Sequence, residues 1–177
     1  MEAVQTMPMG SKINFRMLFF AGIIFFLLGW PAYTFINDML HHGIVDRGSY
    51  LEVDLKSLGF FDLDPYHATI ASVPEHYRKL DGKRVLLKGE IYRADASYGK
   101  LTDFTFVYSI AKCCFGGPPK VQERVFATVN KDAKVDYDGG VLYEVVGRLS
   151  ITMKRDPTTN QITEVYHLDV EQVATAK

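Results

Sequence analysis

The sequence predicts a mostly β protein in which one N-terminal transmembrane helix precedes a small OB-like β-barrel. Two observations support this fold class: a chargeless apolar run over residues 17–36, and, after residue 82, five segments in which apolar and polar side chains alternate. Gly89 and Gly147 fall on the inward faces of two of these segments, where the bent strands of small barrels often need glycine. An open sandwich is the alternative architecture.

The composition sets limits on size and partners. A chain of 177 residues has room for one domain of ordinary size and an appendage. With 47% apolar and 23% charged residues, a wholly disordered chain is excluded. Lys and Arg total 20 against 21 Asp and Glu, so the sequence predicts no nucleic-acid partner.

The apolar run predicts an uncleaved signal anchor, with the lipid bilayer as its partner. At ~1.5 Å rise per residue the run spans about 30 Å, the thickness of the hydrocarbon core. A cleaved signal peptide is the alternative, but its core is normally about 7–15 residues and ends at small residues. Pro31 is expected to kink or end the helix. The predicted anchor residues are Phe19, Ile23 and Leu27, with Trp30 and Tyr33 at the headgroup layer.

Charges beside the run predict its orientation. Lys12 and Arg16 precede it, whereas residues 37–46 carry two Asp and no Lys or Arg. The positive-inside bias then places the N-terminus in the cytoplasm and the β domain outside the bacterial cytoplasmic (inner) membrane. The predicted parts are a cytoplasmic tail (1–16), a single-pass helix (17–36), a neck (37–49) and an extracytoplasmic OB-like domain (50–177).

The elements of the β domain follow in order. Residues 50–56 alternate strictly and predict a half-buried strand added to one edge, and residues 73–80 predict a short helix beginning near Pro74. The five main strands are expected at residues 83–92, 101–110, 123–130, 141–153 and 162–173. Phe104, Phe106 and Tyr108 share one face of the second, where core packing is favoured over a base-stacking platform.

The least generic string is Cys113, Cys114, Phe115, Gly116, Gly117, Pro118 and Pro119, which is expected as a loop after the aromatic strand. Three interpretations of the vicinal cysteines compete: a reactive or metal-binding thiol pair, a strained disulfide, and a structural pair. A third metal ligand would come from His67, His76 or His167. The two prolines fix an extended backbone, so a rigid recognition loop and a plain structural turn both stay open.

Catalytic motifs have little support. Asp62 and Asp64 could act as paired acids but are more typical of a solvated loop, and His41-His42 could bind metal at the membrane surface but are more typical of solvated side chains. No Ser/His/Asp order, nucleophile elbow or zinc-protease motif is present. The sequence therefore favours a non-enzyme and predicts no cofactor.

Beyond these patterns, the chain resembles an uncharacterised family of bacterial exported or membrane-anchored proteins. The matching pieces are residues 46–58, 80–92, 106–122 (FVYSIAKCCFGGPPKVQ), 145–151 and 165–173, and the CC-x-GGPP string is the most specific of them. More distantly, the chain is similar to bacterial OB-like envelope proteins with a cysteine pair in the corresponding loop. The resemblance implies an extracytoplasmic domain and no established activity.

Two functions from different classes follow. The first is a membrane-anchored, non-enzymatic accessory or interaction protein of the cell envelope, whose helix holds the domain beside an integral-membrane or envelope partner. The second is a thiol-redox or metal-handling envelope protein that uses Cys113 and Cys114.

Overall fold

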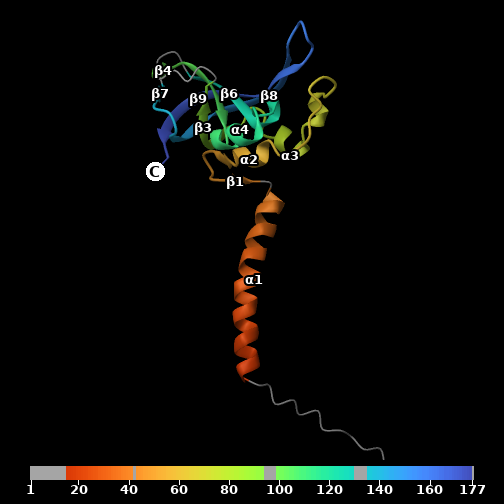
Figure 1. Cartoon of the computed structure of the whole chain (residues 1–177), viewed down its shortest axis with the longest axis vertical. Helices are drawn as coiled ribbons and strands as arrows, with labels where there is room; N and C mark the ends of the chain where they lie inside the picture. The colour runs from red at the N-terminus through yellow and green to blue at the C-terminus, as the bar shows by residue number, and fades with distance from the viewer. Residues whose placement is uncertain (1–14, 42, 94–98, 130–134, 177) are drawn as a thin grey trace, which may run out of the picture. The chain divides into compact units, whose positions relative to one another are not determined.

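A computed structural model describes residues 15–41, 43–93, 99–129 and 135–176, apart from the side chains of residues 15, 37–41 and 113–115. The chain divides into two compact units, residues 1–40 and 41–177 (Figure 1). Among the described residues, the first unit contributes one helix, and the strands belong to the second.

Helix α1 runs from Phe15 to His41. Within it, residues 16–36 have a mean hydropathy of 1.9 and none is buried, so α1 is long and apolar enough to span a membrane or serve as a signal anchor. Of the two outcomes expected at Pro31, a kink or the end of the helix, the second is wrong, because α1 continues for ten residues beyond it. Proline removes one backbone donor, and the Thr34 hydroxyl donates to the Pro31 carbonyl (2.9 Å) in the following turn.

The second unit is built mainly of strands, as predicted. Seven of them form one sheet in the order β1-β2-β3-β5-β6-β9-β8, and β8 also pairs with β3. The pairings of β3, β5, β6, β9 and β8 therefore form a cycle that returns to its first strand. The β2–β3 and β6–β9 pairs are parallel and the others are antiparallel. The bounds are β1 Ile44–Asp46, β2 Leu51–Val53, β3 Arg84–Tyr92, β5 Asp103–Val107, β6 Arg124–Val129, β8 Leu142–Arg155 and β9 Ile162–Thr175.

Short elements fill the connections. Strands β4 (Gly99–Leu101) and β7 (Val135–Tyr137) form a separate two-stranded sheet. The helical turns are α2 Leu55–Leu58, η1 Ile70–Ser72, α3 Glu75–Arg78, α4 Ile110–Gly116 and η2 Val121–Glu123. Helix α3 lies where the sequence predicted a short helix.

Two strand predictions need correction. The strand expected over residues 50–56 ends at Val53, because the Asp54 carboxylate accepts from the Lys56 amide (3.1 Å) and caps α2. The aromatic strand ends at Val107 rather than Ile110. Phe104 and Phe106 are buried as expected, but Tyr108 lies beyond the strand and is 45% exposed.

The core lies between the strands, where the alternation predicted it. Fully buried side chains include Leu87 and Ile91 on β3, Leu149 on β8 and Tyr166 on β9. The inward glycines mark close backbone approaches: a Cβ at Gly147 would overlap the Asp169 carbonyl oxygen, and a Cβ at Gly89 that of Val107. Any side chain at these positions would push neighbouring strands apart.

Candidate functional site

The CC-x-GGPP string borders a groove of about 220 Å³ on the second unit. Its walls come from the start of α2, the end of β5, α4, the segment that follows α4, and η2. We call it the Gly-Pro groove; its lining residues are Leu55, Lys56, Val107, Tyr108, Ser109, Lys112, Gly116, Gly117, Pro118, Pro119, Lys120 and Glu123. The volume is below the roughly 300–1,000 Å³ of typical small-molecule pockets.

The floor of the groove is apolar and rigid. Leu55 on α2 and Val107 at the end of β5 are each 2% exposed. Two buried tyrosines hold helix α2 in place. The Tyr77 hydroxyl donates to the Ser57 carbonyl (2.6 Å), and the Tyr166 hydroxyl donates to the Leu58 carbonyl (3.1 Å). Burial, and secondarily the neighbouring Tyr77, raises the pKa of Tyr166, so its hydroxyl remains a donor.

Aromatic and cationic groups form the rim. Tyr108 is 45% exposed, and the Lys56 ammonium lies 5.7 Å from the centre of its ring. This distance is within the range of a cation–π contact. Tyr108 is therefore the exposed aromatic residue of the groove, whereas its apolar neighbours Leu55 and Val107 are almost completely buried.

One carboxylate organises the opposite wall. Glu123 accepts from the Lys112 ammonium (2.9 Å) and from the Lys120 amide (3.2 Å). Burial alone would raise the pKa of Glu123, but these two hydrogen bonds, together with the positive charges of Lys112 and Lys120, outweigh it and the pKa is lowered. The Lys120 ammonium itself lies 3.8 Å from an Asp62 oxygen. The charged residues that line the groove are three lysines, Lys56, Lys112 and Lys120, and one glutamate, Glu123. The lining therefore carries an excess of positive charge.

The backbone of the string differs from the expected loop. Residues 110–116 form α4, so Cys113, Cys114 and Phe115 are helical, and their side chains lie outside the described part of the structure. The Ile110 amide donates to a Glu90 carboxylate oxygen (2.8 Å) at the start of α4. Gly117 has φ +88°, a conformation that favours glycine. It ends α4, and Pro118 and Pro119 follow it. The irregular part of the string is thus limited to residues 117–119.

The histidines proposed as third ligands have other neighbours. His67 Nδ1 lies 3.0 Å from an Asp64 oxygen, the His76 ring packs edge-on against Tyr77, and His167 Nδ1 lies 3.0 Å from a Glu164 oxygen. Among the described residues, no three His, Cys, Asp or Glu side chains are grouped so that they could hold a metal ion. His42 and the side chain of His41 lie outside the described residues.

The two acids of the 62–64 segment have separate partners. Asp64 accepts from the Tyr66 amide (2.8 Å) and the His67 amide (3.1 Å), which is the geometry of a capped turn. These hydrogen bonds and the His67 ring lower the pKa of Asp64. The Asp62 carboxylate is fully exposed and faces Lys120.

Sequence reasoning missed most of the groove. Lys56, Lys112, Lys120 and Glu123 are ordinary surface residues in the sequence, and only folding places them around Tyr108. A second missed cluster lies on β8 and β9, where buried Glu164 contacts the Lys154 ammonium (2.7 Å) as well as His167. Cross-strand pairing of Lys154 with Glu164 explains the cluster, and such a signal is invisible until the register is known.

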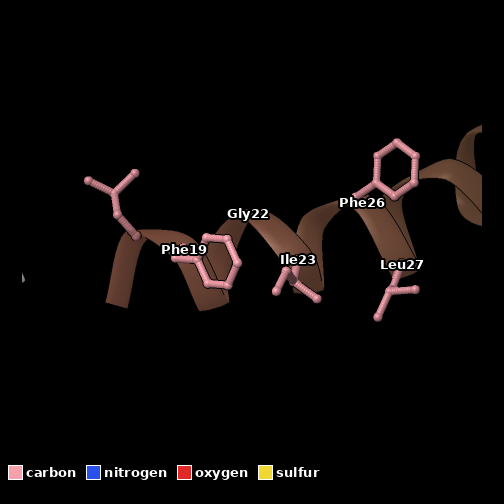
Figure 2. A pocket seen from close by; sticks show the side chains of 6 residues that line it. Phe19, Gly22, Ile23, Phe26 and Leu27 are labelled. Carbon is pink, nitrogen blue, oxygen red and sulfur yellow. The ribbon is translucent and has the colours of Figure 1, made fainter. Parts of the chain in front are cut away.

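A shallow notch also marks one face of α1. Figure 2 shows Phe19, Ile23, Phe26 and Leu27 around Gly22, which has no side chain to fill the space between them. The surroundings are entirely apolar side chains of one exposed helix, which suit lipid contact.

Comparison with known proteins supports the fold. No protein-family model matches the chain, and no curated protein matches it. A crystal structure of a DUF3299 family protein from Pseudomonas aeruginosa is similar at TM-score 0.51 and 18% identity, over 73% of this chain and 98% of that one. A protein from Leishmania major, named as a candidate aspartyl-tRNA synthetase, gives TM-score 0.34 at 14% identity, over 74% of this chain and 21% of that one. The Pseudomonas likeness extends to the fold alone.

Proposed function

We propose that this protein is a membrane-anchored, non-enzymatic interaction protein of the bacterial cell envelope and that the Gly-Pro groove is its recognition surface. The observation that carries the proposal is the groove itself. It combines a buried apolar floor, an exposed tyrosine, a proline-fixed wall and an excess of lysines. A segment of a partner protein with an apolar side chain beside acidic residues has the complementary chemistry.

The anchor is the second part of the proposal. Helix α1 would hold the β domain at the surface of the cytoplasmic membrane, with the N-terminus in the cytoplasm, as Lys12 and Arg16 favour. Confinement to the membrane raises the effective concentration of the groove for an integral-membrane partner. Protease added to intact spheroplasts should then remove the β domain, whereas protection of the domain would reverse the orientation.

We also propose that the β domain is an OB-like barrel. The cyclic pairing of β3, β5, β6, β9 and β8 supports it, as does the parallel pairing of β6 with β9. Closure leaves no free sheet edge among these five strands. Slow amide exchange along both edges of β3, toward β5 and toward β8, is expected for a closed barrel; fast exchange along the β8 side would favour an open sandwich.

Photocrosslinking tests the recognition surface. A benzophenone amino acid at Tyr108 should form one adduct with an envelope protein in native membranes. The same group at Tyr66, which is 48% exposed and lies outside the groove, should not. Charge reversal at Lys56 and Lys120 should reduce the Tyr108 adduct, whereas reversal at Lys79, paired with Glu75 on α3, should leave it unchanged. Equal adducts from Tyr108 and Tyr66 would contradict the proposal.

Substitution of the two cysteines distinguishes this proposal from the alternative function in thiol-redox or metal chemistry. Under the interaction hypothesis, replacing both Cys113 and Cys114 by serine preserves the adduct and the cellular function. Loss of function without loss of the adduct would assign a chemical role to the thiols instead.

A further inference from the structure

The short segment after α2 displays an aromatic ring beside a carboxylate. Among the described large apolar side chains, Phe60 is the most exposed, at 86%, and it directly follows Gly59, the C-cap of α2. Its backbone is fixed, because the Phe60 amide donates to the Ser57 carbonyl (2.9 Å). Two residues further along, the side chain of Asp62 is fully exposed. The segment from Phe60 to Asp62 therefore has the chemistry that the proposed function requires of a ligand for the Gly-Pro groove.

This segment borders the groove of its own chain. A Cβ at Gly59 would lie 2.9 Å from the Cα of Glu123, which lines the groove. The Asp62 carboxylate lies 3.8 Å from the ammonium of Lys120, a second lining residue. Because its ring is 86% exposed, Phe60 does not fill this groove itself. Segment and groove thus lie side by side on one surface of the second unit.

The spacing within the segment matches the spacing within the groove. The Lys56 ammonium lies 5.7 Å from the centre of the Tyr108 ring. Two residues of backbone span at most ~7 Å, which limits the separation of Phe60 and Asp62. The ring and the carboxylate of a second molecule can therefore reach Tyr108 and Lys56 together. Asp62 is available for this contact, because an exposed ion pair such as that with Lys120 contributes little to stability.

We propose that the occupant of the Gly-Pro groove is the 60–62 segment of a second copy of this chain. The inference rests on the proposed function of the groove and names its partner. Phe60 of each copy packs against the Tyr108 ring of the other copy. Asp62 of each copy pairs with Lys56 of the other. Because segment and groove adjoin on one surface, a two-fold axis beside them makes both contacts reciprocal, as in an isologous dimer.

Exchange of charge between two variants tests this contact in the full chain in mild detergent, with sedimentation equilibrium as the measurement. Asp62→Lys leaves the groove unchanged, and Lys56→Glu leaves the segment unchanged. Each variant alone should lose the dimer, because like charges then face each other in both contacts. An equimolar mixture should recover it, because both contacts then join opposite charges. Contacts within a single chain cannot produce this recovery.

The aromatic contact is tested separately. Phe60→Ala should raise the dissociation constant of the dimer by about tenfold for each contact, and thus roughly hundredfold for the two. Tyr66→Ala is the matched control, because Tyr66 is 48% exposed and lies outside the groove. Lys79→Glu is the control for charge, because Lys79 pairs with Glu75 on α3. Both control variants should dimerise as the unsubstituted chain does.

The expected result is a dimer that each charge variant loses and that their mixture recovers. A monomeric chain, a dimer that survives in both charge variants, or a mixture that stays monomeric would overturn the inference. An unchanged dissociation constant for Phe60→Ala would overturn it as well. The benzophenone group at Tyr108 in native membranes separates this failure from that of the proposed function. An adduct with a different envelope protein would overturn the second copy as occupant and keep the groove as a recognition surface, whereas equal adducts from Tyr108 and Tyr66 would overturn both.

Discussion

Gly59 is the position at which a single added methyl group should disturb the groove most cleanly. It ends α2, with φ −94° and ψ 1°, so alanine meets no backbone restriction there. A Cβ at this position would lie 2.9 Å from Glu123 Cα, 3.0 Å from the Gln122 carbonyl oxygen and 3.0 Å from Glu123 Cγ. Ordinary van der Waals contact begins at 3.4 Å, so α2 and η2 must separate by about 0.5 Å. Two of the three obstructing atoms are backbone atoms, which have little freedom to move aside.

The magnitude follows from this separation. Overpacking of this kind costs about 1–3 kcal/mol, while restricting the unfolded chain by replacing glycine returns about 0.4–1 kcal/mol. We therefore expect Gly59→Ala to lower the free energy of unfolding by about 1–2 kcal/mol, which corresponds to roughly 2–8 °C in Tm for a chain of this length. The separation should weaken the hydrogen bond that Gln122 Nε2 donates to the Phe61 carbonyl (3.0 Å), and it should displace Glu123, which lines the groove.

Denaturant unfolding of the full chain in mild detergent, followed by near-ultraviolet circular dichroism, measures the change. Gly116→Ala is the control, because nothing lies within 4 Å of a Cβ there. Its stability should change by less than about 0.5 kcal/mol, as for most surface substitutions. Equal stabilities of the Gly59 and Gly116 variants would refute the close approach of α2 and η2.

Three further predictions concern single side chains. Tyr166→Phe leaves the Leu58 carbonyl without its buried donor and should cost about 1–3 kcal/mol in the same unfolding assay. The lowered pKa of Glu123 stabilises the fold above the ordinary pKa of 4.5, and that contribution is lost as pH falls through the folded-state value. Glu123→Gln should therefore flatten the loss of stability below pH 4.5, and an unchanged profile would show that its carboxylate is not stabilised in the fold. Arg155→Lys removes a guanidinium that donates to the Tyr66 and Ala68 carbonyls, so limited proteolysis should cut the 60–72 segment faster.

Long alternating segments could be predicted from the sequence because alternation reports directly on burial. Strands β3, β6, β8 and β9 lie within two residues of their expected bounds, since each presents one continuous apolar face to the core. The inward positions of Gly89 and Gly147 were also accessible, because glycine interrupts an otherwise apolar face. The pairing partners of the strands could not be predicted, because a pairing such as that of β6 with β9 depends on contacts between residues distant in sequence.

Short helical turns were beyond the reach of periodicity. Leu51, Val53 and Leu55 alternate as a strand does, yet Leu55 begins α2, and one Asp54 hydrogen bond decides between the two structures. For the same reason, the sequence pattern did not predict that the cysteine pair lies in a short helix, α4. A four- to seven-residue helix has too few positions to establish a period of 3.6, so capping and tertiary contacts determine it.

Helix α2 connects two parts of the Gly-Pro groove. Its first residue forms the groove floor, and its C-cap Gly59 lies against Glu123, which also lines the groove. Moving α2 by about 0.5 Å through Gly59→Ala should therefore weaken the Tyr108 adduct. Gly116→Ala, where an added Cβ meets nothing within 4 Å, should leave the adduct unchanged. A Gly59 variant that loses stability but keeps the full Tyr108 adduct would show that recognition at the groove does not depend on the position of α2.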